Sequence, residues 1–266
     1  MFLKRILRRI KRGVRWFFFF LGVPTCIGCE EPLDTPFMPL CPECYEKYKN
    51  IKTANCSQCS ALLHECSCVN EYLESHFIKK HFKVLRYESR EENATANELI
   101  FSLKMDNRAD VRDFIASEMA ETLEEFVRSR CEVIFTNVPR RRAAIIEYGI
   151  DHAKDVAKLL ADHFNCKYRS LLFSKAKRAQ KTIRGAEREK NVCFGIRPLA
   201  PRSLAGKTVI IVDDIVTTGA SVATAGALIR SLGAKEIVAA SFASTYKDKP
   251  QELRAADLRR WNNIWH

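Results

Sequence analysis

Short apolar runs alternate with amphipathic stretches between residues 80 and 245 of this 266-residue chain. Runs rich in β-branched residues predict buried strands, whereas apolar residues three and four positions apart predict helices. Strands that alternate with helices are typical of an α/β fold with a mostly parallel sheet. The expected strands cover residues 83–87, 132–139, 167–173, 207–213 and 236–244, and the expected helices cover 97–103, 111–130, 143–164 and 222–233.

The stretch from Val209 to Ser221 carries the most specific chemistry. Four β-branched apolar residues, Val209 to Val212, predict a strand buried on both faces. Asp213 and Asp214 follow, and their oxygens suit sugar hydroxyls or hydrated Mg²⁺. The stretch then opens into a helix, whose first backbone N–H groups attract phosphate. The pattern therefore predicts a site for a phosphorylated ribose. A plain strand followed by an N-capped helix is the alternative, but capping needs only one such polar side chain.

The same residues resemble the 5-phosphoribosyl-1-diphosphate (PRPP) signature of type I phosphoribosyltransferases. The resemblance implies that fold, and it implies PRPP bound together with Mg²⁺. The residues that it assigns to PRPP binding are Asp213, Asp214, Thr217, Thr218, Gly219, Ala220 and Ser221.

Eight of the eleven cysteines lie in four close pairs near the N-terminus. Close cysteine pairs place two thiolates on one turn, and two turns complete a tetrahedral zinc shell. We expect two structural zinc ions in a small double zinc-ribbon module at residues 24–70. Consecutive and interleaved pairings are both open, and His64 is an alternative ligand. Paired spacing of this kind favours a reducing, cytoplasmic location. The expected ligands are Cys26, Cys29, Cys41, Cys44, Cys56, Cys59, Cys66 and Cys68.

Residues 1–23 predict a basic amphipathic arm. The formal net charge of the chain is +12, and seven basic residues with no acidic residue lie in the first fifteen positions. Three interpretations are open: residues 1–20 contact a membrane surface, bind nucleic-acid phosphates, or dock their apolar face on the next module. The apolar run at residues 16–23 is too short to span a bilayer. We therefore expect neither a transmembrane helix nor a cleaved signal peptide.

Cysteine knuckles followed by a phosphoribosyltransferase-like domain resemble the layout of the ComF family. The resemblance covers about residues 24–245 and includes Leu103-Lys104, the segment 137–142, and the polar stretch 177–192. One segment departs from the family pattern: residues 148–152 read Tyr-Gly-Ile-Asp-His where the family has Arg-Gly-Phe-Asn-Gln. The candidates that the resemblance implies for diphosphate binding are Lys104, Arg140, Arg141, Arg178, Gln180, Lys181 and Arg188.

The ComF resemblance implies a role in DNA uptake during natural transformation, with a helicase-like partner at the inner face of the membrane. It also implies transfer of a phosphoribosyl group with release of pyrophosphate, although the sequence identifies no acceptor. A non-catalytic module that binds single-stranded DNA or a 5′-phosphate is the alternative function, and a purine-responsive regulator is a third. The expected phosphoribosyltransferase-like domain spans residues 80–245, and residues 246–266 form a C-terminal tail.

Overall fold

The computed structural model describes residue 22 and residues 24–56, 58–87, 94–105, 108–175 and 193–245. The N-terminal arm, the polar stretch 176–192 and the tail 246–266 lie outside these residues. The predictions for Arg178, Gln180, Lys181 and Arg188 therefore lie outside them as well. Within the described part of the chain, no helix combines the length and the apolar character needed to cross a membrane.

A five-stranded sheet, with strand order β1-β7-β6-β2-β3, forms the centre of the fold. Every pair of neighbouring strands in it is parallel, which confirms the expected α/β class. The strands are β1 (His81–Arg86), β2 (Val133–Asn137), β3 (Lys167–Tyr168), β6 (Thr208–Val216) and β7 (Glu236–Ser244). A separate antiparallel pair consists of β4 (Leu172–Ser174) and β5 (Phe194–Ile196).

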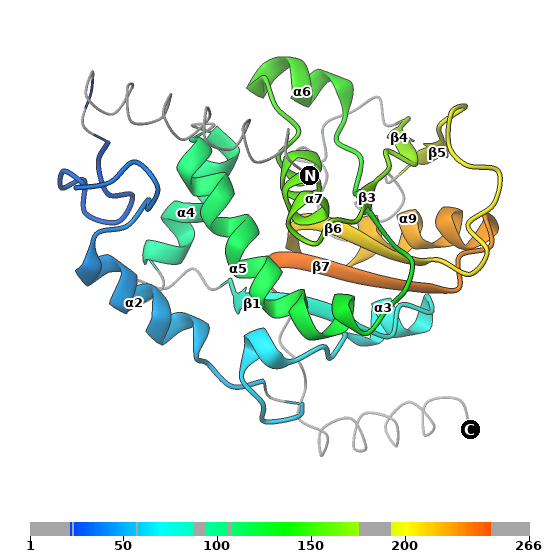
Figure 1. Cartoon of the computed structure of the whole chain (residues 1–266), viewed down its shortest axis with the longest axis horizontal. Helices are drawn as coiled ribbons and strands as arrows, with labels where there is room; N and C mark the ends of the chain where they lie inside the picture. Colours follow the sequence, from blue (N-terminus) through cyan, green and yellow to red (C-terminus); the bar gives the residue numbers. More distant parts are fainter. Residues whose placement is uncertain are drawn as a thin grey trace, which may run out of the picture.

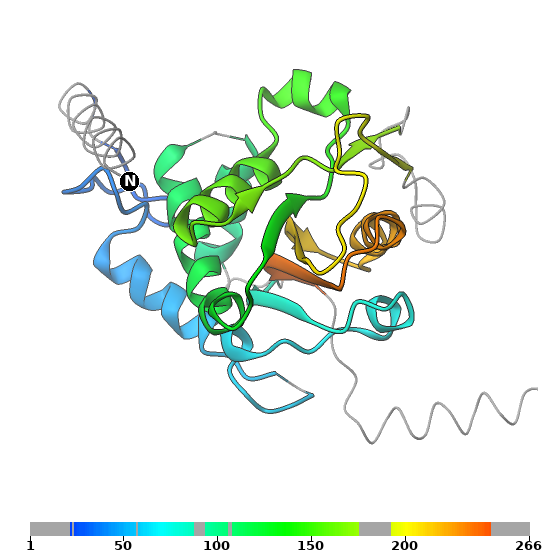
Figure 2. The ribbon, with the colours of Figure 1, turned by 45° about the vertical axis from the view of Figure 1, so that its right-hand side comes forward.

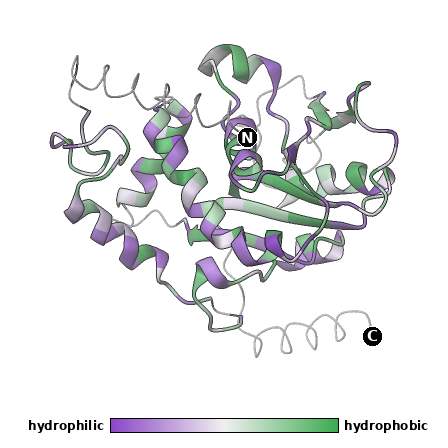
Figure 3. Cartoon of the chain, in the orientation of Figure 1, coloured by the Kyte–Doolittle hydropathy of each residue, from purple (hydrophilic) through white to green (hydrophobic). Residues whose placement is uncertain are grey.

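Helices cover both faces of the sheet (Figures 1 and 2). The helices α5 (Ala109–Arg128) and α7 (His152–His163) pack on one face, and α9 (Ala220–Ser231) packs on the other. The central strands are accordingly rich in hydrophobic residues (Figure 3), and Val209 to Val212 are fully buried. The remaining helices are α2 (Pro42–Lys52), the short 3₁₀ helix η1 (Leu63–Glu65), α3 (Glu71–Ser75), α4 (Ala94–Met105) and α6 (Arg142–Tyr148).

Two expected elements are each divided into two. The prediction of a single helix at 143–164 was wrong, because Gly149 takes a left-handed conformation (φ 73°) that ends α6. Asp151 then caps α7 by accepting a hydrogen bond from the backbone N–H of Lys154. The prediction of a single strand at 167–173 was also wrong. Only Lys167–Tyr168 joins the main sheet, while Leu172–Ser174 pairs with β5.

The first cysteine segment shares the hydrophobic core of the larger domain. Cys26, Cys44 and Tyr48 belong to the same buried cluster as sheet and helix residues such as Phe114 and Phe242. The hydroxyl of Tyr48 also donates to Glu118 of α5 at 2.8 Å. The region around α2 is therefore packed into the α/β domain, although its cysteines come first in the chain.

Candidate functional site

The site predicted from the sequence lies at the carboxyl ends of β6 and β2, which are neighbours in the sheet. Asn137 of β2 is in register with Val212 of β6, and the backbone N–H of Val138 donates to the carbonyl of Val212 at 2.9 Å. Chain segments that leave these two strands emerge at the same edge, where open α/β sheets bind ligands. The acidic pair after Val212 and the arginines after Pro139 are thereby brought to one edge of the sheet.

The loop from Thr217 to Gly219 connects β6 to α9. Thr217 and Thr218 are exposed, whereas Gly219 and Ala220 are buried. Gly219 lies at the N-cap of α9 with φ +90°, a conformation that favours glycine. A Cβ atom at this position would also come within 2.8 Å of the Leu73 side chain. The loop therefore requires glycine for two reasons, and it leads into a twelve-residue helix whose N-cap residue has no capping side chain.

Asp213 and Asp214 occupy different electrostatic environments. Asp214 Oδ2 lies 3.3 Å from Lys104 Nζ, and its Oδ1 accepts from the backbone N–H of Ile215 at 2.7 Å. Burial opposes ionisation of Asp214, but Lys104 and this hydrogen bond lower its pKa overall. Burial and the neighbouring Asp214 charge raise the pKa of Asp213 well above its ordinary value. Burial and the charges around the pair therefore shift the pKa values of the two carboxyl groups in opposite directions.

The buried side chain of His152 holds the backbone of Lys104 in place. His152 Nε2 donates to the carbonyl oxygen of Lys104 at 3.0 Å, and His152 is only 2% exposed. Since the carbonyl can only accept, this contact places the proton of a neutral imidazole on Nε2. His152 Nδ1 is buried without a hydrogen-bond partner in the described part of the chain. Burial, followed by the charge of Arg140, lowers the pKa of His152.

Asp151 and His152 each have a defined structural partner. Asp151 Oδ1 accepts from the backbone N–H of Lys154 at 3.2 Å and so caps α7. His152 Nε2 donates to the carbonyl of Lys104. Arg140 Nη1 donates to the carbonyl of Ile150 at 3.2 Å, so this segment also holds one candidate cation. Asp151 and His152 thus provide an N-cap for α7 and a hydrogen-bond donor to Lys104.

The cysteines form two groups, and their composition confirms the consecutive pairing. In each group the four Sγ atoms lie within 4.8 Å of one another. The groups are Cys26, Cys29, Cys41, Cys44, called cluster 1, and Cys56, Cys59, Cys66, Cys68, called cluster 2.

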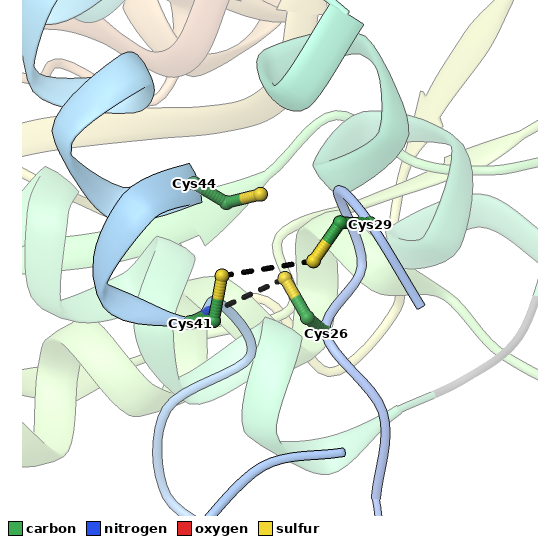
Figure 4. A group of neighbouring side chains, drawn as sticks. All are labelled: Cys26, Cys29, Cys41 and Cys44. Atoms are coloured by element: carbon green, nitrogen blue, oxygen red, sulfur yellow. Dashed lines mark hydrogen bonds between the residues drawn. The ribbon is translucent and has the colours of Figure 1, made fainter. Parts of the chain in front are cut away.

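The surroundings of cluster 1 fit a zinc ion. Its four sulfur atoms point toward one another, with Cys41 and Cys44 at the start of α2 (Figure 4). Cys26 Sγ accepts backbone N–H groups from Cys41 at 3.2 Å and from Gly28 at 3.4 Å. Burial opposes ionisation, but these amides lower the pKa of Cys26 to about 7. A Cβ atom on Gly28 would lie 2.8 Å from Cys44 Sγ, so the turn must be glycine for the sulfur atoms to converge.

Cluster 2 lies against β1 and fits a zinc ion for similar reasons. The backbone N–H of Gln58 donates to Cys56 Sγ at 3.4 Å, and that of Cys68 donates to Cys66 Sγ at 3.3 Å. Lys83 is 1% exposed, and its Nζ lies 3.6 Å from Cys66 Sγ. A buried ammonium beside four thiolates offsets the negative charge that remains after zinc binding.

The structure gathers the described candidates for PRPP and diphosphate binding at one edge of the sheet. Lys104 and Asp214 are in contact, and the loop 217–221 follows directly. Sequence reasoning missed Asn70 and Leu73, which contact this loop from the segment after cluster 2. Asn followed by Glu-Tyr-Leu-Glu is a helix-start signal, but nothing in it indicates a loop 148 residues away.

Comparison with known proteins finds matches for part of the chain. Residues 151–262 match the family described as phosphoribosyl transferase domain. No curated protein matches the chain. Among solved structures, a purine phosphoribosyltransferase from Pyrococcus horikoshii Ot3 matches with 20% identity and a TM-score of 0.34. That match covers 51% of this chain and 83% of the other.

Proposed function

We propose that this chain, which contains a phosphoribosyl transferase domain, binds PRPP and Mg²⁺ at the β6–α9 loop. The observation that carries the proposal is the placement of Asp214 beside Lys104, next to a glycine-dependent turn into α9. In this assignment the N–H groups at the start of α9 and the hydroxyls of the loop hold the 5′-phosphate. The carboxyl groups of Asp213 and Asp214 accept the ribose hydroxyls.

The cations of the site suit the diphosphate. Lys104 lies beside the acidic pair, and Arg140 and Arg141 follow β2 at the same edge. Carboxylate oxygens are also the protein ligands that Mg²⁺ prefers, so Asp213 and Asp214 would hold a hydrated ion beside PRPP. When bound, Mg²⁺ supplies positive charge that screens the diphosphate.

We further propose phosphoribosyl transfer as the reaction. A nucleophile forms a bond to ribose C1 while the bond from C1 to the diphosphate oxygen breaks, and pyrophosphate leaves with that electron pair. The residues of this chain hold the phosphate at α9 and orient the ribose at Asp213 and Asp214. Lys104 and Arg140 stabilise the negative charge that develops on the leaving group.

A binding role in DNA uptake is the second candidate. Two cysteine clusters ahead of a phosphoribosyl transferase domain support a ComF-type protein, and the net charge of +12 suits nucleic-acid phosphates. In this role the chain binds single-stranded DNA through its phosphates and acts with a helicase-like partner, with residues 1–20 at the inner membrane surface.

Titration calorimetry with PRPP and MgCl₂ tests the first proposal. The wild-type chain is expected to bind, and the double variant Asp213→Ala, Asp214→Ala is expected to lose measurable binding. Asp162→Ala, on the exposed side of α7, is the matched control and is expected to bind normally. Equal affinity of the double variant and the control would remove the ribose assignment.

A second experiment separates the two functions. Pyrophosphate release is measured with PRPP and a set of candidate nucleophiles, and single-stranded DNA binding is measured across salt concentrations. Turnover without DNA affinity supports the transferase. DNA binding that falls steeply with salt, without turnover, supports the binding module.

A further inference from the structure

Asn70 connects the segment after cluster 2 to the loop before α9. It lies two residues after Cys68 and caps α3, because its Oδ1 accepts from the backbone N–H of Leu73 at 2.9 Å. Its Nδ2 donates to the backbone carbonyl of Thr218 at 3.1 Å. The oxygen of the Asn70 amide therefore caps α3, while its nitrogen binds the candidate phosphate loop.

Leu73 supports the same loop by packing. Its side chain is fully buried and occupies the space beside Gly219, where a Cβ atom would come within 2.8 Å of it. Ile78 packs in the same way against Gly226 of α9. Close packing at Gly219 and at Gly226 fixes the distance between the segment 70–78 and α9.

The other end of this segment is fixed at cluster 2. Lys83 Nζ donates to the carbonyl of Cys68 at 2.9 Å, and Gln58 Nε2 donates to the carbonyl of Val69 at 3.2 Å. The backbone N–H of His81 donates to the carbonyl of Ser67 at 3.0 Å. The path from cluster 2 to Asn70 is thus short and hydrogen-bonded along its length.

We propose that Asn70 and Leu73 are positioning residues for the phosphate loop, and that they couple the integrity of cluster 2 to the affinity of that loop. The proposal rests on the PRPP-binding function proposed above. Zinc at cluster 2 would fix Cys66 and Cys68, and the hydrogen bonds from Lys83 and Gln58 would then hold Asn70 at the distance that Thr218 requires. Loss of that ion releases the loop without changing any residue that touches the ligand.

Asn70→Asp separates the two tasks of the side chain. Aspartate keeps an oxygen for the cap of α3, but it replaces the donor to Thr218 with an acceptor. We expect the affinity for ribose 5-phosphate and for PRPP with Mg²⁺ to fall about tenfold. The affinity for inorganic pyrophosphate, which engages Lys104 and Arg140, is expected to stay unchanged. A general loss of structure would lower all three affinities together.

Asn70→Ser and Ser75→Ala complete the series. Serine also caps a helix but is too short to reach Thr218, so it is expected to behave like the aspartate variant. Ser75 lies at the end of the same helix and is exposed, so its alanine variant is expected to bind like wild type. Unchanged ribose 5-phosphate affinity in both Asn70 variants would overturn the proposal.

Hydrogen exchange tests the coupling without any ligand. Residues 217–222 are expected to exchange faster in Asn70→Asp and in Cys66→Ser than in wild type and in Ser75→Ala. Metal analysis is expected to show one zinc ion fewer in Cys66→Ser, and none fewer in Asn70→Asp. Equal loop exchange in Asn70→Asp and wild type would refute the coupling. If wild type bound neither PRPP nor ribose 5-phosphate, the proposed function would fail instead, while the exchange result would stand.

Discussion

Lys104 Nζ lies 3.3 Å from Asp214 Oδ2, so the last turn of α4 is joined to the end of β6 by an ion pair. The backbone carbonyl of Lys104 is held in turn by His152. Lys104 is therefore fixed at two points, although its side chain is 37% exposed. A cation held in this way needs little reorganisation when an anionic ligand arrives.

Removing the charge of Lys104 is expected to weaken binding of PRPP and of pyrophosphate. For Lys104→Met we expect affinity to fall about 10- to 100-fold, because hydrogen bonds to charged groups contribute about 1.5–3 kcal/mol. Calorimetry measures the loss, and Lys158→Met on α7 is the control. Wild-type pyrophosphate affinity in the Lys104 variant would contradict its assignment to the diphosphate.

Neutralising Asp213 is expected to stabilise the chain while abolishing ribose binding. The pKa of Asp213 is raised by burial and by Asp214, so ionising it in the folded state costs free energy. A raised pKa contributes to stability at low pH, and this contribution is lost as the pH rises through the pKa of Asp213 in the folded chain. Asp213→Asn should therefore raise the melting temperature more at pH 8 than at pH 5, as thermal unfolding will show. A variant less stable than wild type at pH 8 would contradict this electrostatic explanation.

Replacing His152 distinguishes its hydrogen bond from its charge. Its pKa is lowered, chiefly by burial and then by Arg140, while Asp214 and Arg112 also act on it. A lowered pKa contributes to stability at pH values above 6.5, the pKa of His152 in the unfolded chain. This contribution is lost as the pH falls through the pKa of His152 in the folded chain. His152→Gln should keep the donor to Lys104 and remove this acid sensitivity.

His152→Leu should lower the free energy of unfolding by about 1–3 kcal/mol at pH 7, because the Lys104 carbonyl loses its partner. Unfolding curves from pH 5 to pH 8 test both variants, and equal acid sensitivity of wild type and His152→Gln would contradict the assignment.

Replacing Gly219 is expected to damage the loop. Alanine there must hold φ at +90° and also displace Leu73, so we expect a loss of about 1–3 kcal/mol in stability together with loss of ribose 5-phosphate binding. Gly206→Ala is the control, since Gly206 has a similar φ of +77° but a new Cβ atom would meet only a side-chain oxygen at 4.0 Å. Denaturant unfolding and calorimetry measure the two effects.

Zinc removal is expected to destabilise the whole domain. Cys26 and Cys44 of cluster 1 share a hydrophobic core with Phe114 and Phe242, so loss of the ion disturbs packing on the sheet. Metal analysis should find two zinc ions per chain, and a strong chelator should lower the melting temperature of the single main transition. A chelated sample that keeps the wild-type transition of the α/β domain would show that the cysteine segment folds independently.

The sequence pattern predicted the elements that depend on local chemistry. The run from Val209 to Val212 is buried as expected, and the eight paired cysteines form two groups of four. The pattern failed where a turn interrupts a continuous periodicity. Gly149 and Asp151 divide one apparent helix, but Ala143 to Phe164 keeps its apolar spacing across the break.

Long-range contacts could not be predicted from local sequence. The bond from Asn70 to Thr218 joins positions 148 residues apart, and the bond from Tyr48 to Glu118 joins positions 70 apart. Each partner is an ordinary polar residue in its own segment. Only the fold of the sheet brings these residues together, so periodicity and spacing contain no signal for the contacts.

The order of the strands determines when each strand pair can form during synthesis on the ribosome. In the described part of the chain β1 pairs with β7 alone, so this edge of β1 stays open until residues 236–244 have emerged. Both cysteine clusters precede β1 and lie outside the tunnel long before that moment. Metal can therefore reach both cysteine clusters before the last strand of the sheet is available.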